Sequence, residues 1–283
     1  MNRNILARAL PLSAPRKLAG MDRLDAAAIV VPGVQVRVLE RCTSTNSVLL
    51  NGPYTGPVLL AAEEQTAGRG RRGRRWHSAP GAGITFSLSH SLRRPAREAA
   101  GLSLVAGVAV ARALHALGVA QAALKWPNDL VAAGAKLGGI LVETRSQGRA
   151  THAVIGVGLN CRHDVGLERR LRRKVGALDQ FVEKIDRNEI IARVARSLLD
   201  ALEEFEIKGL ESVRRDWEAM DAHAGQRLRV RLADGRVLTG LASGLDADGG
   251  LRLATRGGLR AVRSGRVVSL GERKERRPLR RPA

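Results

Sequence analysis

Cysteine is nearly absent from this chain of 283 residues, which contains only Cys42 and Cys161, far apart and outside any C-x-x-C spacing. A disulfide framework and a cysteine-rich zinc site are therefore excluded. Aromatic residues are equally scarce, with three Trp, three Phe and one Tyr. The core must consequently be built from Leu, Val, Ile and Ala.

Acidic residues are also few relative to basic ones. Lys and Arg number 48 and Asp and Glu number 27, which leaves a net charge of +21. Such an excess predicts affinity for an anion, but it does not distinguish nucleic acid, nucleotide phosphates and an acidic protein. Hydrophobic residues at 44% and charged residues at 27% are globular values and exclude a wholly disordered chain.

No apolar run is long enough to cross a bilayer. The longest, residues 102–117, is interrupted by Arg112 and His115. Near the N-terminus, Pro11 and Arg16 interrupt any signal-peptide core. We therefore expect a cytoplasmic protein without a membrane anchor.

The pattern of the chain predicts an α+β fold in which helices flank a mixed β-sheet, followed by a small C-terminal β-barrel. After Gly225 short alternating strands appear, and Asp234-Gly235 is a strong hairpin signal. We expect a partly disordered lead-in, a main domain, the small barrel and a basic tail, at residues 1–33, 34–222, 223–271 and 272–283.

Alternation and apolar runs locate the elements of the main domain. Strands are expected at 34–39, 58–62, 84–89, 122–126, 129–132, 137–143 and 153–159. A short helix should start within Thr43–Asn46, and a long buried helix should run from Pro95 to Gly118. Two further helices are expected between a cap at Asn188 and Met220, after a basic loop at 162–174.

The segment from Gly68 to Trp76 reads G-R-G-R-R-G-R-R-W and formally satisfies G-x-G-x-x-G. A dinucleotide fingerprint also needs a helix directly after the loop, whereas Pro80, Gly81 and Gly83 lead here into another strand. No Lys-Ser or Lys-Thr closes the segment, so a Walker A loop is excluded too.

The same segment has too little apolar surface to join a core, and we expect a mobile loop. Arginine supplies permanently charged forks for phosphate or carboxylate, and glycine lets backbone amides approach an anion. Trp76 offers a flat face for a base. A solvated basic loop or a nucleic-acid-binding arm remains an equal alternative from this segment alone.

Three further motifs carry polar residues at strand ends. Lys125–Asp129 (K-W-P-N-D) is expected to form a turn. Lys136–Glu143 has a lysine directly before an apolar run that should be a buried strand. Gly156–Asn160 has glycines inside an otherwise apolar strand. Structural alternatives are an ordinary hairpin turn with a packed Trp and an edge lysine that discourages strand association. The glycines suggest that something approaches the backbone closely.

Taken in this order with Thr43–Asn46 and Gln65–Trp76, these motifs resemble the biotin protein ligases over residues 36–270. The resemblance implies a class II synthetase-like catalytic domain and an SH3-like barrel. It also implies activation of biotin with ATP and Mg²⁺ to biotinyl-5′-AMP, then transfer to one lysine of a carrier domain of acetyl-CoA carboxylase or a related carboxylase. Joining two anions requires neutralising charge rather than a covalent protein intermediate.

The resemblance also implies roles for individual residues. Lys136, Arg69 and Asp129 would be catalytic, and Asp129 would hold Mg²⁺, through water. The biotin-binding set would be Ser44, Thr45, Asn46, Gln65, Arg69, Gly70, Arg71 and Lys136. The ATP-binding set would be Arg71, Arg74, Trp76, Asn128, Asp129, Lys136 and Asn160.

Some members of this family carry an N-terminal helix-turn-helix domain and act as repressors. Only about 35 residues precede the first core strand here, fewer than the roughly 50 that such a domain needs. We therefore expect the monofunctional type, as a monomer or homodimer, without sequence-specific nucleic-acid binding. The alternatives are a lipoate–protein ligase or lipoyl transferase of the same fold and, more remotely, a nucleic-acid-binding protein.

Overall fold

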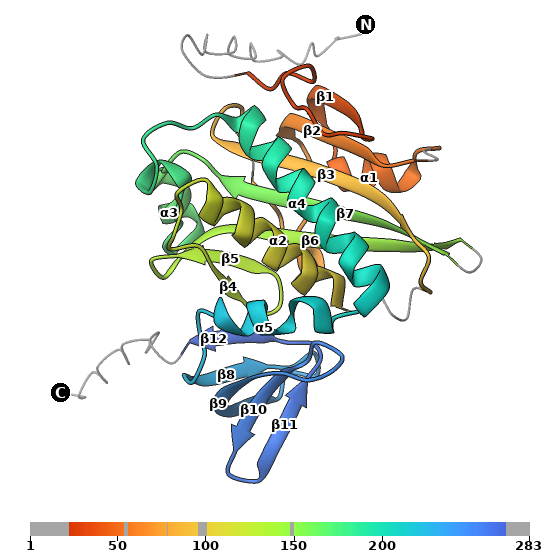
Figure 1. Cartoon of the computed structure of the whole chain (residues 1–283). Coiled ribbons are helices and arrows are strands. Elements are labelled where there is room, and N and C mark those ends of the chain that lie inside the picture. The colour runs from red at the N-terminus through yellow and green to blue at the C-terminus, as the bar shows by residue number, and fades with distance from the viewer. Residues whose placement is uncertain (1–22, 54–55, 78, 96–100, 148–149, 270–283) are drawn as a thin grey trace, which may run out of the picture.

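The computed structural model describes residues 23–53, 56–77, 79–95, 101–147 and 150–269. Two units lie one above the other in Figure 1: a large one built on a seven-stranded sheet and a small one built on a five-stranded sheet. The predicted α+β class, with helices around a mixed sheet and a β-rich C-terminal part, is confirmed.

The large sheet has the order β1-β2-β3-β7-β6-β5-β4. Its strands are β1 (Gln35–Cys42), β2 (Val58–Gln65), β3 (Gly83–Leu92), β4 (Ala123–Lys125), β5 (Asp129–Ala132), β6 (Ala135–Gln147) and β7 (Ala150–Asn160). Only β1 and β2 run parallel, and the other described pairs are antiparallel. The parallel pair is connected by helix α1 (Thr45–Asn51), which is the crossover that such a pair needs.

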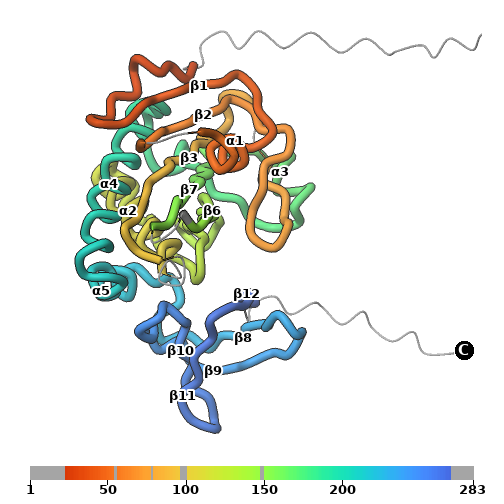
Figure 2. The backbone as a smooth tube through the Cα atoms, turned by 90° about the vertical axis from the view of Figure 1, so that its right-hand side faces the viewer, coloured from red at the N-terminus to blue at the C-terminus, as the bar shows by residue number. Residues whose placement is uncertain are grey.

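Helices cover the two faces of this sheet unequally. α2 (Leu102–Ala116), α4 (Arg187–Lys208) and α5 (Glu211–Ala219) lie on one side, whereas α1 and α3 (Val165–Leu171) lie on the other, as Figure 2 shows. α2 is buried almost all round, which its uniformly apolar sequence predicts. The aliphatic core lies between α2, α4 and the sheet, so the opposite face is available for a site. Two short 3₁₀ turns, η1 (Arg71–Gly73) and η3 (Leu178–Gln180), lie in the connections.

The small sheet has the order β11-β10-β9-β8-β12. Its strands are β8 (Arg227–Arg231), β9 (Val237–Leu245), β10 (Leu251–Thr255), β11 (Gly258–Val262) and β12 (Arg266–Ser269). No pairing between β11 and β12 closes it within the described residues, so it is an open sheet, consistent with an SH3-like barrel. Its inner side is apolar, with Leu228, Val230 and Leu253 nearly inaccessible.

Hydrogen bonds join the two units. The indole Nε1 of Trp126 donates to the carbonyl of Gly249 at 3.1 Å, and the amide of Leu245 donates to Glu218 Oε1 at 3.0 Å. Trp126 is only 3% exposed. The tryptophan of the K-W-P-N-D turn is therefore a packing residue at this junction.

Several element expectations need correction. The basic stretch 162–174 is not a simple loop, because Asp164 caps α3 by accepting from the amide of Leu167. Asn188 is not the cap of α4: Asp186 is, and it accepts from the amide of Glu189. α2 begins at Leu102 rather than Pro95, and residues 96–100 lie outside the described residues.

The expected lead-in and basic tail lie mostly outside the description, which omits residues 1–22 and 270–283. From residue 23 the chain packs on the large unit, with Leu24, Ile29 and Val31 buried. Among the described residues no helix combines the length and the apolar character that a membrane crossing requires.

Candidate active site

A cavity of about 360 Å³ lies where the start of α1, the 68–76 loop, β6, β7 and β12 converge. It collects twelve of the residues singled out from the sequence: Ser44, Thr45, Asn46, Gln65, Arg69, Gly70, Arg71, Arg74, Trp76, Asn128, Asp129 and Lys136. The remaining one, Asn160, lines adjoining cavities instead. Segments far apart in sequence are thus brought to one place.

One end of the cavity is neutral and polar. The carboxamide oxygen of Gln65, at the end of β2, accepts from the amide of Thr45 at 2.8 Å and from its hydroxyl at 3.2 Å. Ser44 and Thr45 are each 3% exposed. Because α1 starts directly after β1, and β2 pairs with β1 in parallel, these groups meet at the same edge of the sheet.

Two residues that the sequence reasoning missed complete this polar end. Ser87 on β3 is fully buried, and its Oγ lies 2.7 Å from Thr45 Oγ1 and 2.6 Å from Asn46 Oδ1. Asn46 Nδ2 donates to Glu143 Oε2 at 3.0 Å and to the carbonyl of Leu141 at 3.1 Å. The result is a connected set of donors and acceptors around the buried side chains of Thr45, Asn46 and Ser87.

Glu143 also fixes the arginine-glycine loop. Both of its carboxylate oxygens accept from Arg69 Nη2, at 3.0 and 2.9 Å. The bond connects the loop to β6, the strand that begins near Lys136. Glu143 therefore joins the polar end of the cavity to the loop that covers it.

The 68–76 loop has internal order of its own. Arg69 and Arg75 form a β-bridge, and the amide of Gly70 donates to the carbonyl of Arg74 at 2.7 Å. Its tip turns at Arg72 and Gly73, with φ of 57° and 69°, a conformation that glycine adopts readily and arginine rarely. Among the described residues between this loop and β3 no helix occurs, which agrees with the rejection of a dinucleotide fingerprint.

Trp76 ends this loop against the floor of the cavity. Its indole packs on Gly158 of β7, where a Cβ atom would lie 2.5 Å from Trp76 Cζ2 and 3.0 Å from Nε1. Among the described groups, Trp76 Nε1 is a buried donor without an acceptor. The glycine inside β7 is thus explained by the close approach of an indole.

The other end of the cavity is cationic and centres on Lys136. Its ammonium pairs with Asp129, and both side chains are 17% exposed. Burial lowers the pKa of Lys136, Asp129 opposes that shift, and the neighbouring Arg173 and Arg74 lower the pKa further. The antiparallel pairing of β5 and β6 places the two partners together.

Asparagines hold the backbone around this pair. Asn128 Nδ2 donates to the carbonyl of Ile140 at 2.7 Å, and the amide of Ile140 donates back to the carbonyl of Asn128 at 2.9 Å. Asn160 Nδ2 donates to the carbonyls of Lys136 and Gly176, at 3.2 and 3.0 Å. In this structure Asn160 positions the lysine's backbone.

Cations outnumber anions around Asp129. Burial lowers the pKa of Arg71, and Arg72 and Arg74 lower it further. Burial likewise lowers the pKa of Arg173, and Arg74 and Arg266 add to that effect. Because these like charges repel one another, this end of the cavity is suited to a polyanionic ligand.

Arg173 and Arg266 were also missed. Arg173 follows α3, and Arg266 comes from β12 of the small sheet, yet both line the cavity. No sequence signal identifies them, since each is one arginine among many. Ser87 stands on the polar face of the alternating run 84–89, where the pattern predicts exposure, yet the structure buries it.

Comparisons with known proteins agree with this arrangement. A model of the Biotin/lipoate A/B protein ligase family matches residues 38–160, and one of the Biotin protein ligase C terminal domain matches residues 223–269. The chain is 36% identical over 238 residues to the bifunctional ligase/repressor BirA of Escherichia coli, covering 83% of this chain and 74% of that one. It is also 36% identical over 244 residues to the biotin–[acetyl-CoA-carboxylase] ligase of Mycobacterium tuberculosis, covering 83% and 89%.

Among solved structures, the fold is similar to the biotin protein ligase from Aquifex aeolicus in complex with biotin and ATP. The TM-score is 0.72 at 27% identity, over 83% of this chain and 97% of that one.

Proposed function

The chain belongs to the biotin protein ligase family, and we propose that it activates biotin with ATP and then joins it to a lysine of a carrier protein. In the first step the biotin carboxylate attacks the α-phosphorus of ATP and pyrophosphate leaves. In the second, the lysine amine attacks the carbonyl of biotinyl-5′-AMP and AMP leaves. The observation that carries this proposal is the pairing, in one cavity, of a neutral polar end with a cationic end centred on Lys136.

The neutral end suits the ring of biotin. A ureido group offers both N–H donors and a carbonyl acceptor, and the hydroxyls and amides of Ser44, Thr45, Asn46 and Gln65 supply the complementary groups. Ser87 belongs to this set because it contacts both Thr45 and Asn46. Arg69 and Gly70 then cover the tail, with Arg69 held in place by Glu143.

The cationic end suits the nucleotide and the reacting carboxylate. Lys136 bridges the carboxylate and the α-phosphate as charge accumulates in the transition state. Asp129 holds the ammonium in position, and Arg71 and Arg74 neutralise phosphate oxygens. Trp76, which lines the cavity, packs near the base, and Asn128 shapes the K-W-P-N-D turn.

Magnesium enters this proposal as the usual companion of ATP. Among the described residues no group of three or more His, Cys, Asp and Glu could hold a metal ion. Asp129 is a carboxylate at the cationic end, and it is already paired with Lys136. The ion would therefore be held mainly by phosphate oxygens, with Asp129 acting through water, as Mg²⁺ commonly is in nucleotide sites.

The proposal also covers the acceptor protein, the compartment and the oligomeric state. The acceptor is a biotin carboxyl carrier domain of acetyl-CoA carboxylase or a related carboxylase, and the enzyme acts in the cytoplasm as a monomer or homodimer. The division into residues 34–222 and 223–271 accords with the two sheets. A lipoate ligase is not favoured, because the C-terminal match is to a biotin protein ligase domain.

The proposal is tested by incubating the protein with biotin and MgATP without any carrier and measuring pyrophosphate release and bound adenylate. Release that depends on biotin and not on lipoate supports the proposal. Lys136→Ala should abolish release while leaving biotin affinity within about tenfold, because a charge used in the transition state affects turnover more than binding. Equal release with lipoate, or no release with either, would refute it.

A further inference from the structure

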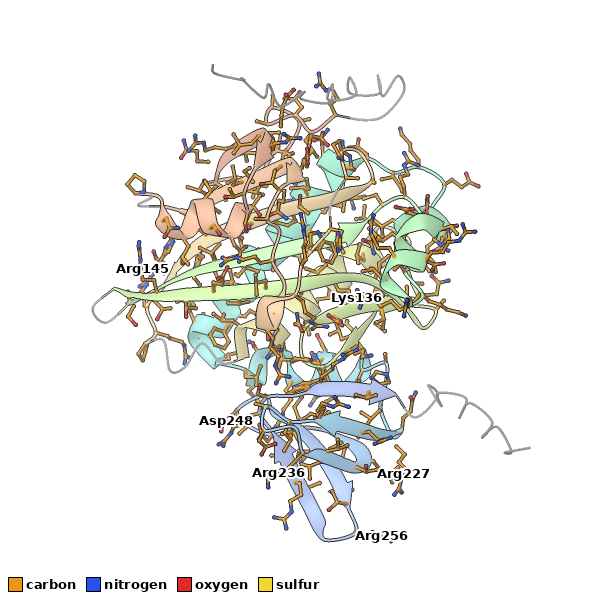
Figure 3. The ribbon with its side chains drawn as sticks, turned by 180° about the vertical axis from the view of Figure 1, so that it is seen from behind. Lys136, Arg145, Arg227, Arg236, Asp248 and Arg256 are labelled. Carbon is orange, nitrogen blue, oxygen red and sulfur yellow. The ribbon has the colours of Figure 1, made fainter. Side chains whose placement is uncertain are left out.

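The outer face of the small sheet carries a row of arginines that the proposed reaction does not use. Arg227, Arg229 and Arg231 alternate along β8 and are all exposed, whereas Leu228 and Val230 between them are 2% and 0% exposed. Because side chains alternate between the faces of a sheet, the three arginines point outward together. We call them the arginine ladder; Arg227 is labelled in Figure 3.

The ladder carries uncompensated charge. In the described part of the chain no carboxylate forms an ion pair with any of its three members. Residues 223–269 contain nine arginines against three aspartates, a net charge of +6. Two of the aspartates pair with arginines outside the ladder, in Arg236–Asp234 and Arg263–Asp248. The face therefore repels other cations and attracts an acidic partner.

Apolar side chains adjoin the ladder on the same face. Arg227 is directly opposite Leu241, and the row continues through Ala254 to Leu259. Leu241 and Leu259 are 46% and 56% exposed. Arginines beside exposed leucines form a mixed surface of the kind that protein interfaces use.

The same face reaches the active-site cavity. Arg231 is the register partner of Arg266 on β12, and Arg266 lines the cavity that also holds Lys136. In Figure 1 β12 lies on the side of the small unit that faces the large one, and Figure 3 labels Lys136 in the large unit above it. A molecule on the ladder would thus have one end at the mouth of the cavity.

We propose that the arginine ladder and its leucine row are the docking surface for an acidic face of the carrier protein that accepts biotin. The inference rests on the proposed function, whose second step requires a protein lysine to reach the adenylate. An acidic surface beside that lysine would be steered by the ladder, and its apolar part would cover Leu241 and Leu259.

Nucleic acid fits this face less well. Residues 223–269 contain no Trp, Phe or Tyr on which a base could stack. The exposed leucines would gain nothing from a phosphate backbone. The combination of charge and apolar surface favours a protein partner.

The experiment separates the two half-reactions. Arg227→Glu/Arg229→Glu is compared with Arg145→Glu/Arg256→Glu, a control with the same change in net charge at exposed arginines away from the ladder, on β6 and at the β10–β11 turn. Pyrophosphate release without carrier and transfer of biotin to a carboxylase carrier domain are both measured. Thermal melting verifies that all variants fold.

The ladder variant should raise KM for the carrier about tenfold or more and weaken its salt dependence. Its pyrophosphate release should stay within twofold of wild type, and the control variant should stay within twofold in both assays. Equal transfer by both variants would overturn the docking surface. Absence of pyrophosphate release in the wild type would instead refute the proposed function, and the inference with it.

Discussion

At the residue scale, the environment of Lys136 determines how its charge responds to pH. Burial lowers its pKa, Asp129 opposes the shift, and Arg173 and Arg74 lower it further. If the charged ammonium is required, activity should fall on the alkaline side at a pH below the ordinary lysine pKa of 10.5. The profile of kcat/KM for pyrophosphate release against pH measures this limb in the free enzyme.

Two variants test whether Lys136 is the group that produces the alkaline limb. Lys136→Arg carries a group that stays charged above pH 12, so its alkaline limb should move upward even if its rate is lower. Arg173→Gln removes a neighbouring like charge and should move the limb in the same direction while keeping the lysine. A limb that stays in place in both variants would mean that another group titrates.

A second residue-scale feature stabilises the scaffold behind the cavity. Arg187 is 1% exposed and donates to both oxygens of Glu63, at 2.8 and 2.9 Å. Glu63 also accepts from the amides of Leu24 and Gly81. One carboxylate thus connects β2, α4, the N-terminal segment and the connection that follows the arginine-glycine loop.

Glu63→Gln should lower the free energy of unfolding by about 3 kcal/mol, because it leaves a buried guanidinium without its counter-charge. Glu64→Gln, in the exposed pair with Arg41 next to it, should cost less than about 1 kcal/mol. Urea denaturation measures both. A loss for Glu63→Gln no larger than that for Glu64→Gln would contradict the structural role.

The difference in free energy of unfolding between wild type and Glu63→Gln should depend on pH, because it depends on the pKa of Glu63. Burial alone would raise this pKa, but the bonds from Arg187, Leu24 and Gly81 outweigh burial and lower it. A lowered folded-state pKa means that the stabilisation is fully present above the unfolded value, near 4.5, and is lost as pH falls through the folded value. The gap between wild type and Glu63→Gln should therefore shrink below about pH 4.5.

At the scale of the element, β7 provides the floor of both ends of the cavity through two glycines. A Cβ on Gly156 would overlap the amide of Asn46, whose Cγ would lie 3.0 Å away, and a Cβ on Gly158 would overlap the Trp76 indole. Gly156→Ala should therefore raise KM for biotin at least several-fold, and Gly158→Ala should raise KM for ATP. Steady-state kinetics with each substrate varied separately measures both effects, and the same pattern in the two variants would contradict this division.

Some elements and site residues could be predicted from the sequence, and others could not. The strands from 58 to 159 are local patterns, and the sequence predicts them well. Arg69, Trp76 and Lys136 stand in equally local motifs and line one cavity, while their roles stay predictions. α3 was missed because its arginines resemble a solvated loop, although Asp164 at its start is a recognisable cap. Arg173 and Arg266 could not be predicted, because their roles depend on a tertiary contact between segments that no local pattern encodes.

At the scale of the whole molecule, the cavity belongs to both sheets. Arg72 Nη2 donates to Ser264 Oγ at 3.0 Å, and Arg266 lines the cavity from β12. The junction below is fixed by Trp126, whose indole bonds to Gly249. The small sheet therefore contributes a charged side chain to the lining of the cavity.

Arg266→Ala should consequently raise KM for ATP several-fold while leaving biotin affinity unchanged, because the lost guanidinium lies among Arg74 and Arg173 at the cationic end. Arg260→Ala, on β11 of the same sheet and exposed, is the matched control and should behave as wild type. Pyrophosphate release at varied ATP, with biotin binding by calorimetry, gives both quantities. If Arg266→Ala matches the control, the small sheet supplies no charge to the reaction.

In that case, ending the chain after Met220 should impair turnover only because the shortened chain is less stable, and a melting curve of the shortened chain would reveal this loss.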